Sequence, residues 1–326
     1  MKIVALNFGR PKGQTVYFLN SAIEAAQAAG AEVELIQMMN KKIERCKGCG
    51  ACSCAVAKGK ANAPFCILKD DLREVAEKVL DADAILLAAP VYVLAPPGQF
   101  FDFVHRFCVC ADQAVMVLRE EERKREGKEH IDPRFLKKQW IGLISLGGCP
   151  FHHWVSFGLP GLNTFTFSTN MKVVGAVDIH SAYGDTPRVA YFREECKKLG
   201  EHLVQSVGKK NEEIEYLGRP GYCPVCHGDI FSVIPGTRKL ECPVCGITGE
   251  LETVDGEPVV HFTEEAIFHS RLNRGGIIDH AMELHGNSEV AKDLYGDLAW
   301  SKPRNFAEEM PAIIQKQQAE KEELGL

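Results

Sequence analysis

Short apolar runs alternate with amphipathic segments over the first two hundred residues. Five near-continuous apolar runs have the length of buried strands, and they lie at residues 2–7, 32–36, 84–88, 140–146 and 172–177. Segments with helical periodicity separate them, at residues 15–29, 72–80, 99–108 and 187–207. Strands that are apolar on both faces and alternate with helices indicate a parallel sheet covered on both sides. We therefore expect an α/β fold with a doubly wound, five-stranded parallel sheet.

Three loops follow the carboxyl ends of these strands, where ligands of such sheets bind. They are residues 7–15, 89–99 and 146–154. The first loop leads into a helix N-terminus, and its amides, Arg10 and the hydroxyl of Thr15 suit a phosphate. It lacks the G-x-x-x-x-G-K-[ST] pattern, which disfavours nucleoside triphosphates. With flat apolar walls from the other two loops, the pattern suits a ligand that has a phosphate tail and a planar ring.

The first two loops also carry motifs of a known family. Arg10, Gln14 and Thr15 match the motif G-S-P-R-x-x-x-N-T, with Phe8-Gly9 in place of Ser-Pro. The second loop matches S-P-V-Y-x-x-x-x-x-G-Q-x-K-x-F-x-D-R at Pro90-Val91-Tyr92, Gly98-Gln99, Phe103 and Arg106. Over about residues 1–210 the sequence resembles the NADPH-dependent FMN reductases and iron–sulfur flavoproteins, which have a flavodoxin-like fold.

This resemblance implies that the chain binds FMN, with Pro90, Val91 and Tyr92 along the isoalloxazine ring. It is also the sole ground for expecting NAD(P)H as a co-substrate, because Gly147-Gly148 in the third loop is too short a pattern for a dinucleotide fingerprint. The candidate flavin-binding residues are Phe8, Arg10, Gln14, Thr15, Pro90, Val91, Tyr92, Gly98, Gln99, Gly147 and Gly148.

Thirteen cysteines are the most unusual feature of the composition, and nine of them fall in two compact groups. In the first group, Cys46, Cys49 and Cys52 are close enough to give three thiolates to one iron–sulfur cubane, and Cys54 or Cys66 would supply the fourth. The iron–sulfur flavoproteins that the chain resembles place a cysteine before an apolar pair and Asp-Asp. Cys66 fits this pattern, although thirteen residues separate it from Cys52, so we prefer Cys66 and expect a [4Fe–4S] cluster. A zinc ion, or cysteines without a metal, are the alternatives.

The second group consists of two C-P-V-C knuckles separated by fifteen residues. Its cysteines are Cys223, Cys226, Cys242 and Cys245. Four thiolates at this spacing give a closed tetrahedral site for zinc or for a single iron. The spacing is similar to that of zinc ribbons and of short rubredoxin-like modules. We favour zinc as a structural clip, whereas iron would make the site a further redox centre.

The composition divides the chain into three parts. We expect an FMN-binding domain over residues 1–210, a four-cysteine ribbon over 211–262 and a helical C-terminal extension over 263–326. Thr263 is a candidate helix N-cap, and further helices are expected at 277–285 and 288–298. The extension is too thin for its own core, so we expect it to wrap the body or a neighbouring subunit of a homo-oligomer. The charge-dense segment 119–138 reads as a solvated helix–loop insert.

Charge and hydropathy narrow the function classes. The 38 basic and 44 acidic residues give a net charge of −6, which leaves no basic surplus to bind nucleic acid. No apolar run approaches the ~20 residues that span a bilayer, and the N-terminus shows no signal-peptide pattern. We therefore expect a cytoplasmic protein with neither nucleic acid nor membrane as a partner.

The third loop carries Cys149, His152 and His153, which are candidates for a substrate-facing thiol and a proton donor. Packing is the alternative that we favour for each of them. Cys108, Cys110 and Cys196 lie in helical segments and are expected to be small core residues.

The sequence as a whole indicates an iron–sulfur flavoprotein oxidoreductase. It would move electrons between a one-electron carrier such as ferredoxin, or NAD(P)H, and a small-molecule acceptor through FMN and a [4Fe–4S] cluster. An electron-transfer module that docks on a larger redox partner, and a redox sensor, are the alternatives.

Overall fold

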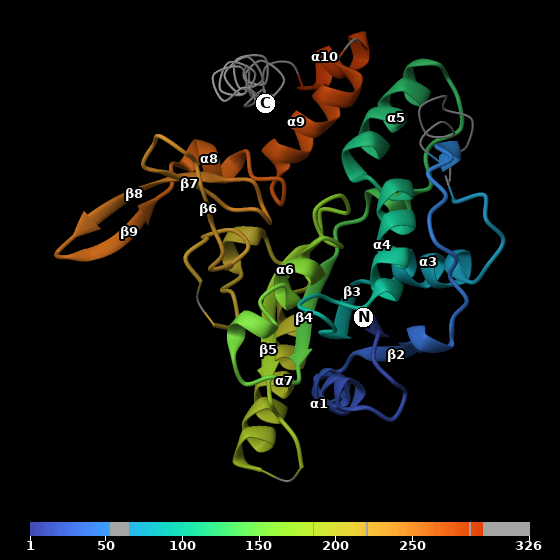
Figure 1. Ribbon diagram of the computed structural model, residues 1–326. Helices are drawn as coiled ribbons and strands as arrows, with labels where there is room; N and C mark the ends of the chain where they lie inside the picture. The colour runs from blue at the N-terminus through green and yellow to red at the C-terminus, as the bar shows by residue number, and fades with distance from the viewer. Residues whose placement is uncertain (53–64, 185, 220, 287, 296–326) are drawn as a thin grey trace, which may run out of the picture.

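A computed structural model describes residues 1–52, 65–184, 186–219, 221–286 and 288–295. At its centre is a five-stranded parallel sheet in the order β2-β1-β3-β4-β5 (Figure 1). The strands are β1 (Lys2–Asn7), β2 (Glu32–Gln37), β3 (Ala84–Pro90), β4 (Trp140–Gly147) and β5 (Lys172–His180). This is the strand order of flavodoxin-like sheets, and it confirms the α/β fold expected from the apolar pattern.

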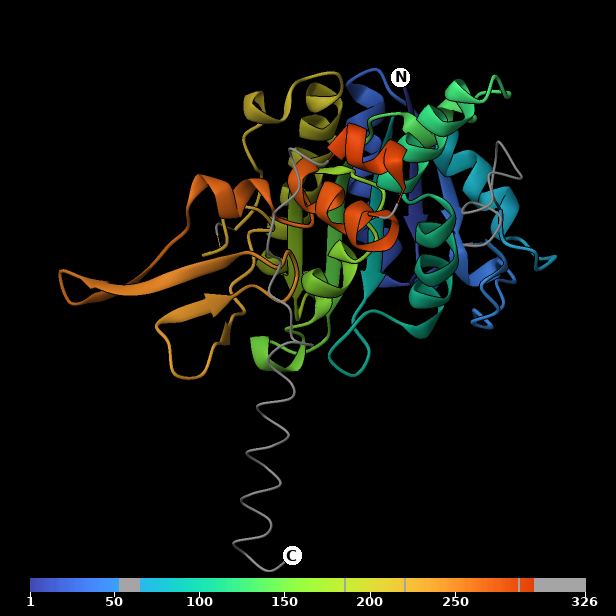
Figure 2. The ribbon, with the colours of Figure 1, turned by 90° about the horizontal axis from the view of Figure 1, so that it is seen from above.

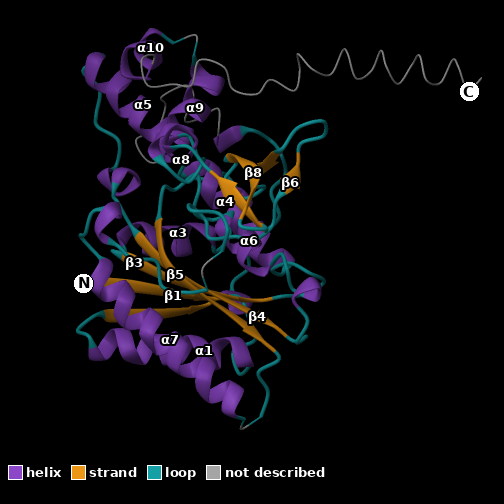
Figure 3. Cartoon of the chain, turned by 90° about the vertical axis from the view of Figure 1, so that its left-hand side faces the viewer, coloured by secondary structure: helices purple, strands orange, loops and turns teal. Residues whose placement is uncertain are grey.

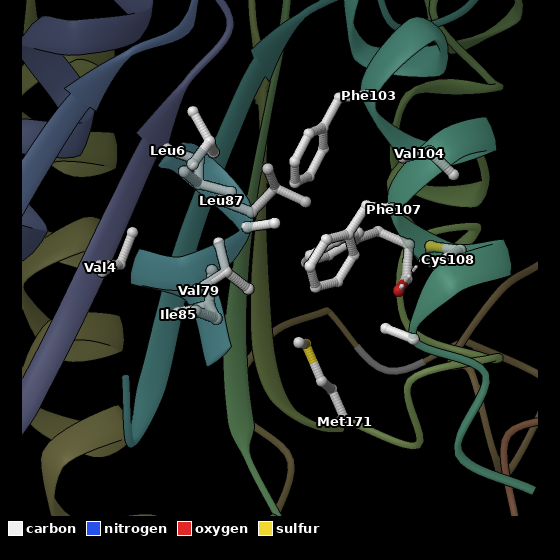
Figure 4. Packing of buried hydrophobic residues seen from close by; sticks show 14 of the residues in the cluster. Val4, Leu6, Val79, Ile85, Leu87, Phe103, Val104, Phe107, Cys108 and Met171 are labelled. Atoms are coloured by element: carbon white, nitrogen blue, oxygen red, sulfur yellow. Dashed lines mark hydrogen bonds between the residues drawn. The ribbon is translucent and has the colours of Figure 1, made fainter. Parts of the chain in front are cut away.

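Helices cover both faces of the sheet, as Figure 3 shows. One face carries α1 (Gln14–Ala28) and α7 (Pro187–Ser206), and the other carries α3 (Leu72–Asp81), α4 (Gly98–Cys110) and α6 (Gly158–Asn163). Because successive strand residues point to opposite faces, β1 sends Ile3 and Ala5 to one core and Val4 and Leu6 to the other. Figure 4 shows the second core, where Phe103 and Phe107 of α4 pack against the strands.

The predicted ribbon is a separate four-stranded antiparallel sheet that projects from the body (Figure 2). Its strands are β6 (Ser232–Val233), β7 (Lys239–Glu241), β8 (Thr248–Val254) and β9 (Glu257–His261). Its buried centre consists of Cys223, Cys242, Cys245 and Ile247. Three of these four fully buried residues are cysteines, and partly buried side chains such as Phe231 and Phe262 pack against them.

Before it reaches the ribbon, the chain returns to the edge of the main sheet. The amide of Leu217 donates to the carbonyl oxygen of Val174 at 2.9 Å, and the amide of Ala176 donates to the carbonyl oxygen of Leu217 at 2.8 Å. Glycine at position 175 permits this approach, because a Cβ there would lie 2.4 Å from the Leu217 oxygen. The edge strand β5 is thus covered over the middle of its length.

The C-terminal helices lie against the body. They are α8 (Glu264–Phe268), which Thr263 caps by accepting a hydrogen bond from Ala266, followed by α9 (Arg274–His285) and α10 (Glu289–Tyr295). Helices α9 and α10 pack on α5 (Gln113–Arg125), in a small core that includes Leu118 and Ala281. The extension therefore wraps the body, as expected, up to residue 295. The last three residues of the helix expected at 288–298 lie outside the described residues.

The contact between α5 and the extension corrects one expectation. Residues 119–138 are not simply a solvated insert, because α5 includes Arg119 and Arg123, which are both buried. The described chain also has four short 3₁₀ helices, at Met38–Asn40, Pro133–Leu136, His152–Trp154 and Asn211–Glu213. Among the helices of the described residues, none is long and apolar enough to cross a bilayer.

Candidate functional site

The first loop presents an uncapped helix end beside β1. The N-cap of α1 is Gly13, which has no side chain to satisfy the first amides of the helix. Asn7 fixes the loop, because its Oδ1 accepts from the amide of Gly9 at 3.0 Å and its Nδ2 donates to the Gly9 oxygen at 3.1 Å. A Cβ on Gly9 would lie 2.6 Å from Oγ1 of Thr15, so only glycine fits. The free amides at the start of α1 and the fixed loop beside them form a candidate anion-binding site.

The other residues of this loop that were predicted to bind the flavin differ in how exposed they are. Arg10 is exposed, Gln14 is partly buried and Thr15 is buried. The side chain of Phe8 is fully buried, with its ring centroid 5.2 Å from that of Phe100. Any contact between Phe8 and a ligand would therefore come from its backbone.

The second loop is strained at its tip. Tyr92 and Ala95 close a tight turn whose two central residues, Val93 and Leu94, adopt φ angles of 50° and 73°. The left-handed conformation costs a non-glycine residue about 1–2 kcal/mol. Strained residues of this kind concentrate at ligand clamps. Val93 is 95% exposed and Tyr92 is 54% exposed, so the turn holds an apolar tip in solvent beside the strand ends.

At the two ends of this second loop, Pro90 and Gln99 are anchored in the fold. Pro90 is buried at the end of β3, and the amide of Val91 donates to the Leu146 oxygen at 2.8 Å. Gln99, which follows Gly98 at the start of α4, donates from Nε2 to the Met38 oxygen at 2.5 Å. Its Oε1, like that of Gln14, is buried without a hydrogen-bond partner among the described residues. Two unsatisfied oxygens therefore lie at the starts of the two helices that follow the first and second loops.

The third loop folds back on the end of β4. A Cβ on Gly147 would lie 2.3 Å from the side chain of Val155, so glycine is required there. The Tyr183 hydroxyl donates to the Gly148 oxygen at 2.9 Å and ties the loop to the chain that follows β5. Cys149 is partly exposed in this loop.

The two histidines of the third loop have different surroundings. The exposed ring of His153 lies 5.9 Å from the ring of Phe151 and 5.5 Å from that of Trp154. The ring of His152 stacks at 6.0 Å on that of His180, and its Nε2 lies 3.8 Å from Oδ1 of Asp229. His153 is therefore part of an exposed aromatic surface, whereas His152 is part of a polar cluster.

A separate cavity of about 230 Å³ gathers the first cysteine group. Its lining includes Cys46, Cys49, Cys52 and Cys66. Gly48 and Gly50, which alternate with the first three cysteines, adopt φ angles of 60° and 67° that turn the chain sharply. Cys54, the alternative fourth ligand, lies outside the described residues.

These thiols are spread more widely than those of the second cysteine group. Within the described residues, they do not form a group whose ligand atoms all lie within 4.8 Å of one another. A cubane separates its cysteine ligands by the width of the cluster, so it needs a wider ring of thiolates than one ion does. The arrangement of these thiols is therefore compatible with an iron–sulfur cluster.

A buried ion pair between Arg106 and Asp70 contacts Cys66 in the wall of this cavity. Nε of Arg106 donates to Sγ of Cys66 at 3.3 Å, and its two terminal nitrogens donate to Asp70 at 2.5 and 3.1 Å. Burial alone would raise the pKa of Asp70, but hydrogen bonds from Arg106 and from the amides of Glu44 and Leu72 lower it overall. The side chains of Arg106 and Asp70 are 0% and 2% exposed, so the pair is a fixed part of the fold.

Cys110 is a neighbour of this cavity that the sequence did not indicate. It is buried, as expected of a core residue. Burial raises the pKa of its thiol, and the nearby Cys52 and Cys66 raise it further. Cys108 and Cys196 are buried as predicted, and burial raises the pKa of each to about 12.

The second cysteine group forms a compact tetrahedron. The Sγ atoms of Cys223 and Cys245 lie 3.3 Å apart, those of Cys226 and Cys242 lie 3.5 Å apart, and all four fall within 4.8 Å of one another. Metal–sulfur bonds of about 2.3 Å place tetrahedral thiolates about 3.8 Å apart. The four residues therefore fit a single metal ion.

The two knuckles have the same backbone geometry. The amide of His227 donates to the Cys223 oxygen at 3.0 Å, and the amide of Gly246 donates to the Cys242 oxygen at 2.8 Å. Both His227 and Gly246 adopt left-handed φ angles, of 57° and 75°. The ring of His227 stacks at 3.6 Å on that of Tyr216, which is just before the ribbon in the chain.

Comparisons with known proteins agree with this geometry. Residues 1–119 match the family of NADPH-dependent FMN reductases. A flavone synthase, cfoJ of Aspergillus candidus, is 27% identical over 296 residues, which cover 87% of this chain and 88% of that protein. An iron–sulfur flavoprotein of Methanosarcina thermophila is 35% identical over 100 residues, which cover 30% of this chain and 48% of that protein. That match thus spans about half of the relative's length.

A solved structure shares the fold over nearly the whole chain. A flavone reductase superposes with a TM-score of 0.69 at 24% identity, and the match covers 97% of each chain. The matched motifs, the flavodoxin-like strand order and the two cysteine sites point the same way as the relatives. Residues 1–119 therefore belong to the family of NADPH-dependent FMN reductases, and part of the chain is similar to the iron–sulfur flavoproteins; these relatives support an FMN-dependent oxidoreductase.

Proposed function

We propose that this protein is an iron–sulfur flavoprotein reductase. It takes electrons from a one-electron carrier such as ferredoxin, or from NAD(P)H, and delivers them to a small organic acceptor with the help of FMN and a [4Fe–4S] cluster. The observation that carries the proposal is the cavity of about 230 Å³ lined by Cys46, Cys49, Cys52 and Cys66. The family relationship supports FMN, and this cavity supports the cluster.

The residues of the first two loops would hold FMN. The amides at the start of α1, with Arg10 and Thr15, suit its phosphate, and Pro90, Val91 and Tyr92 suit its ring. When bound, FMN supplies hydride and single-electron chemistry that side chains lack. The buried, unpartnered oxygens of Gln14 and Gln99 are acceptors at the start of α1 and of α4.

The surface position of the cysteine cavity favours exchange with a protein carrier. Cys46 and Cys49 are exposed, whereas Cys52 and Cys66 are partly buried. A cluster held there has one side open to a docking partner and the other side against Arg106. The same opening supports the second candidate function, an electron-transfer module for a larger redox partner. Substantial turnover by the isolated protein with a soluble electron donor would exclude that second function.

The acceptor that we propose is a planar aromatic molecule. Two relatives are named for flavones, which are planar. The loops at the strand ends expose the large apolar side chains of Tyr92, Phe151 and Trp154, which suit stacking with a flat ring. We propose His153 as the proton donor and Cys149 as the substrate-facing thiol expected in this loop, and His153→Asn should then lower turnover without changing flavin content.

We propose zinc for the ribbon, because its four thiols form a closed tetrahedron without an open position for a substrate. Metal analysis distinguishes this from a mononuclear iron. Homo-oligomer formation stays a prediction, and size-exclusion chromatography with light scattering would test it.

The fourth ligand provides the sharpest test of the cluster. We expect Cys66→Ser, purified anaerobically, to lose most of its iron and acid-labile sulfide and its electron paramagnetic resonance signal after dithionite reduction. Cys54→Ser is the matched variant and should retain about four irons and four sulfides per chain. Full cluster content in Cys66→Ser would contradict the assignment, and absence of iron and sulfide from the wild type would overturn the proposed cluster.

A further inference from the structure

A second, larger cavity of about 740 Å³ lies between the ribbon and the edge of the main sheet. Strand β5, helices α6 and α7 and the first ribbon knuckle line it. Its lining includes several residues that can bind metal ions. Four of these residues form one group. They are His152, Asp178, His180 and Asp229.

The fold brings three of these residues together from two segments. Asp178 and His180 are two residues apart on β5, so their side chains lie on the same face of the strand. Gly147, the last residue of β4, pairs with His180, and the loop that follows it carries His152 to the same place. Donor atoms of His152, Asp178 and His180 all lie within 4.8 Å of one another.

The carboxylate of Asp178 is incompletely satisfied in this arrangement. Its Oδ2 lies 2.7 Å from Nε2 of His180, which is its one ion-pair partner among the described residues. Its Oδ1 is buried and has no hydrogen-bond partner in the described part of the chain. A buried acceptor without a partner costs about 1–3 kcal/mol, and a bound cation would remove that cost.

Charged residues on the ribbon side of the cavity also face this group. Oδ1 of Asp229 lies 3.8 Å from Nε2 of His152, so a second carboxylate faces the group from the ribbon. Two arginines also border the cavity. Arg188 donates to the main-chain oxygen of His180 at 3.3 Å, and the largely exposed Arg219 lies 3.5 Å from Asp229. Neither guanidinium is within ion-pair distance of Asp178 in the described structure.

We propose that His152, Asp178 and His180 bind a divalent first-row transition-metal ion, with Asp229 as a fourth ligand that joins the ribbon to the sheet. Bonds of about 2.0–2.2 Å place two ligands at most about 4.4 Å apart across an ion. The donor atoms of the three residues lie within 4.8 Å of one another, so at most a small rotation brings them to an ion, and His152, with a side chain 43% exposed, can make it.

Two imidazoles with carboxylates favour zinc, cobalt or nickel over magnesium or calcium. The site is distinct from the cysteine tetrahedron, and the proposal does not depend on FMN.

The test uses full-length protein, purified anaerobically with both cysteine sites filled. Co²⁺ is titrated in while heat and the visible absorption spectrum are recorded. We expect one additional Co²⁺ per chain with weak ligand-field bands and without the intense sulfur-to-cobalt charge-transfer bands of a thiolate site. Asp178→Asn and His180→Asn should each weaken binding at least tenfold, and Asp229→Asn should weaken it less.

Two further variants separate a lost ligand from a lost fold. His152→Asn changes a half-exposed side chain, so it should fold normally and still weaken binding tenfold. His261→Asn is the matched control, because His261 also lies beside a carboxylate, that of Glu252 at 3.3 Å, but is on the exposed ribbon hairpin. It should leave the affinity unchanged. Absence of any additional Co²⁺, or unchanged binding in the His152, Asp178 and His180 variants, would overturn the proposal.

Discussion

The two cysteine sites of this chain differ in how the protein surrounds them. In the ribbon, three of the four cysteines are buried and all four thiols lie within 4.8 Å of one another. In the N-terminal cavity, two cysteines are exposed, the thiols are spread more widely and glycines shape the loop. The ribbon has only a small core around its cysteines, whereas the N-terminal cavity rests on a complete α/β domain.

This difference matches the structural role that we propose for the ribbon site and the redox role that we propose for the N-terminal site. A closed tetrahedral site stabilises the segment that contains it and offers no position to a substrate. An open, wider site on a rigid support can change its oxidation state without unfolding the protein. The contrast leads to four predictions about which perturbations each site tolerates.

The largest effect is expected from breaking the ribbon tetrahedron. Metal binding supplies most of the folding free energy of such a unit, because the binding free energy of structural zinc is about 10–16 kcal/mol. Cys242→Ser should therefore unfold β6–β9. Limited proteolysis should then cut between residues 222 and 262, while the melting temperature of the α/β body changes little. Cys196→Ala, which removes a buried thiol from α7, should lower that melting temperature and leave the ribbon metal in place. A protease-resistant, metal-loaded ribbon in Cys242→Ser would contradict the structural role.

The next largest effect concerns the support of the N-terminal cavity. Arg106→Leu leaves the buried Asp70 carboxylate without its partner, which should lower the free energy of unfolding by about 3–5 kcal/mol and reduce the iron content. Urea denaturation measures the first and colorimetric iron analysis the second. Arg73→Leu breaks an exposed pair with Glu77 at 3.7 Å, and should cost less than about 1 kcal/mol. Equal costs for the two variants would argue against a supporting role for Arg106.

The cysteines of the N-terminal cavity should react faster with an alkylating reagent than the cysteines of the ribbon. After air destroys the cluster and the thiols are reduced again, exposed Cys46 and Cys49 should react with iodoacetamide about tenfold faster than buried Cys223 and Cys245. The ribbon ion protects the latter pair and should survive this treatment. Peptide mass spectrometry at timed intervals gives the rates, and similar rates at both sites would remove the contrast.

Acid provides the smallest and most specific perturbation. The pKa of Asp70 is lowered in the folded state, because hydrogen bonds from Arg106 and two amides outweigh its burial. Its contribution to stability is therefore complete above the unfolded pKa of about 4 and is lost as the pH falls through the lower folded pKa. Urea midpoints at pH 5, 4 and 3 should fall more steeply for the wild type than for Asp70→Asn. Parallel slopes would show that this carboxylate is not the responsible group.

Much of the fold could be predicted from the sequence, because burial on both faces leaves an unbroken apolar run. The run 84–88 became β3, in which every residue is buried. The packing of α9 and α10 on α5 could not be predicted, because it joins segments about 160 residues apart and α5 is rich in charge. The turn at Val93 and Leu94 also gave no signal, since it lacks the glycine or asparagine that its φ angles favour.

The candidate sites were predictable to a similar extent. Cysteine spacing indicated both candidate metal sites, because the cysteines of each group are close in sequence. The pairing of Arg106 with Asp70 spans 36 residues, and Cys110 resembled any buried cysteine, so contacts of this kind require the structure. Asp178 and His180 directly follow the predicted strand 172–177, and only the structure, in which β5 extends to His180, shows that the two candidate ligands share a face. Nothing in the sequence linked His152 to them.

The return of the chain to β5 also bears on how the protein behaves when it is concentrated. An uncovered edge strand is a template on which other chains can pair and aggregate. Leu217 occupies that template between Val174 and Ala176, and the glycine at position 175 keeps room for it. The segment that leads to the ribbon therefore reduces the tendency of the central sheet to associate with other chains through its β5 edge.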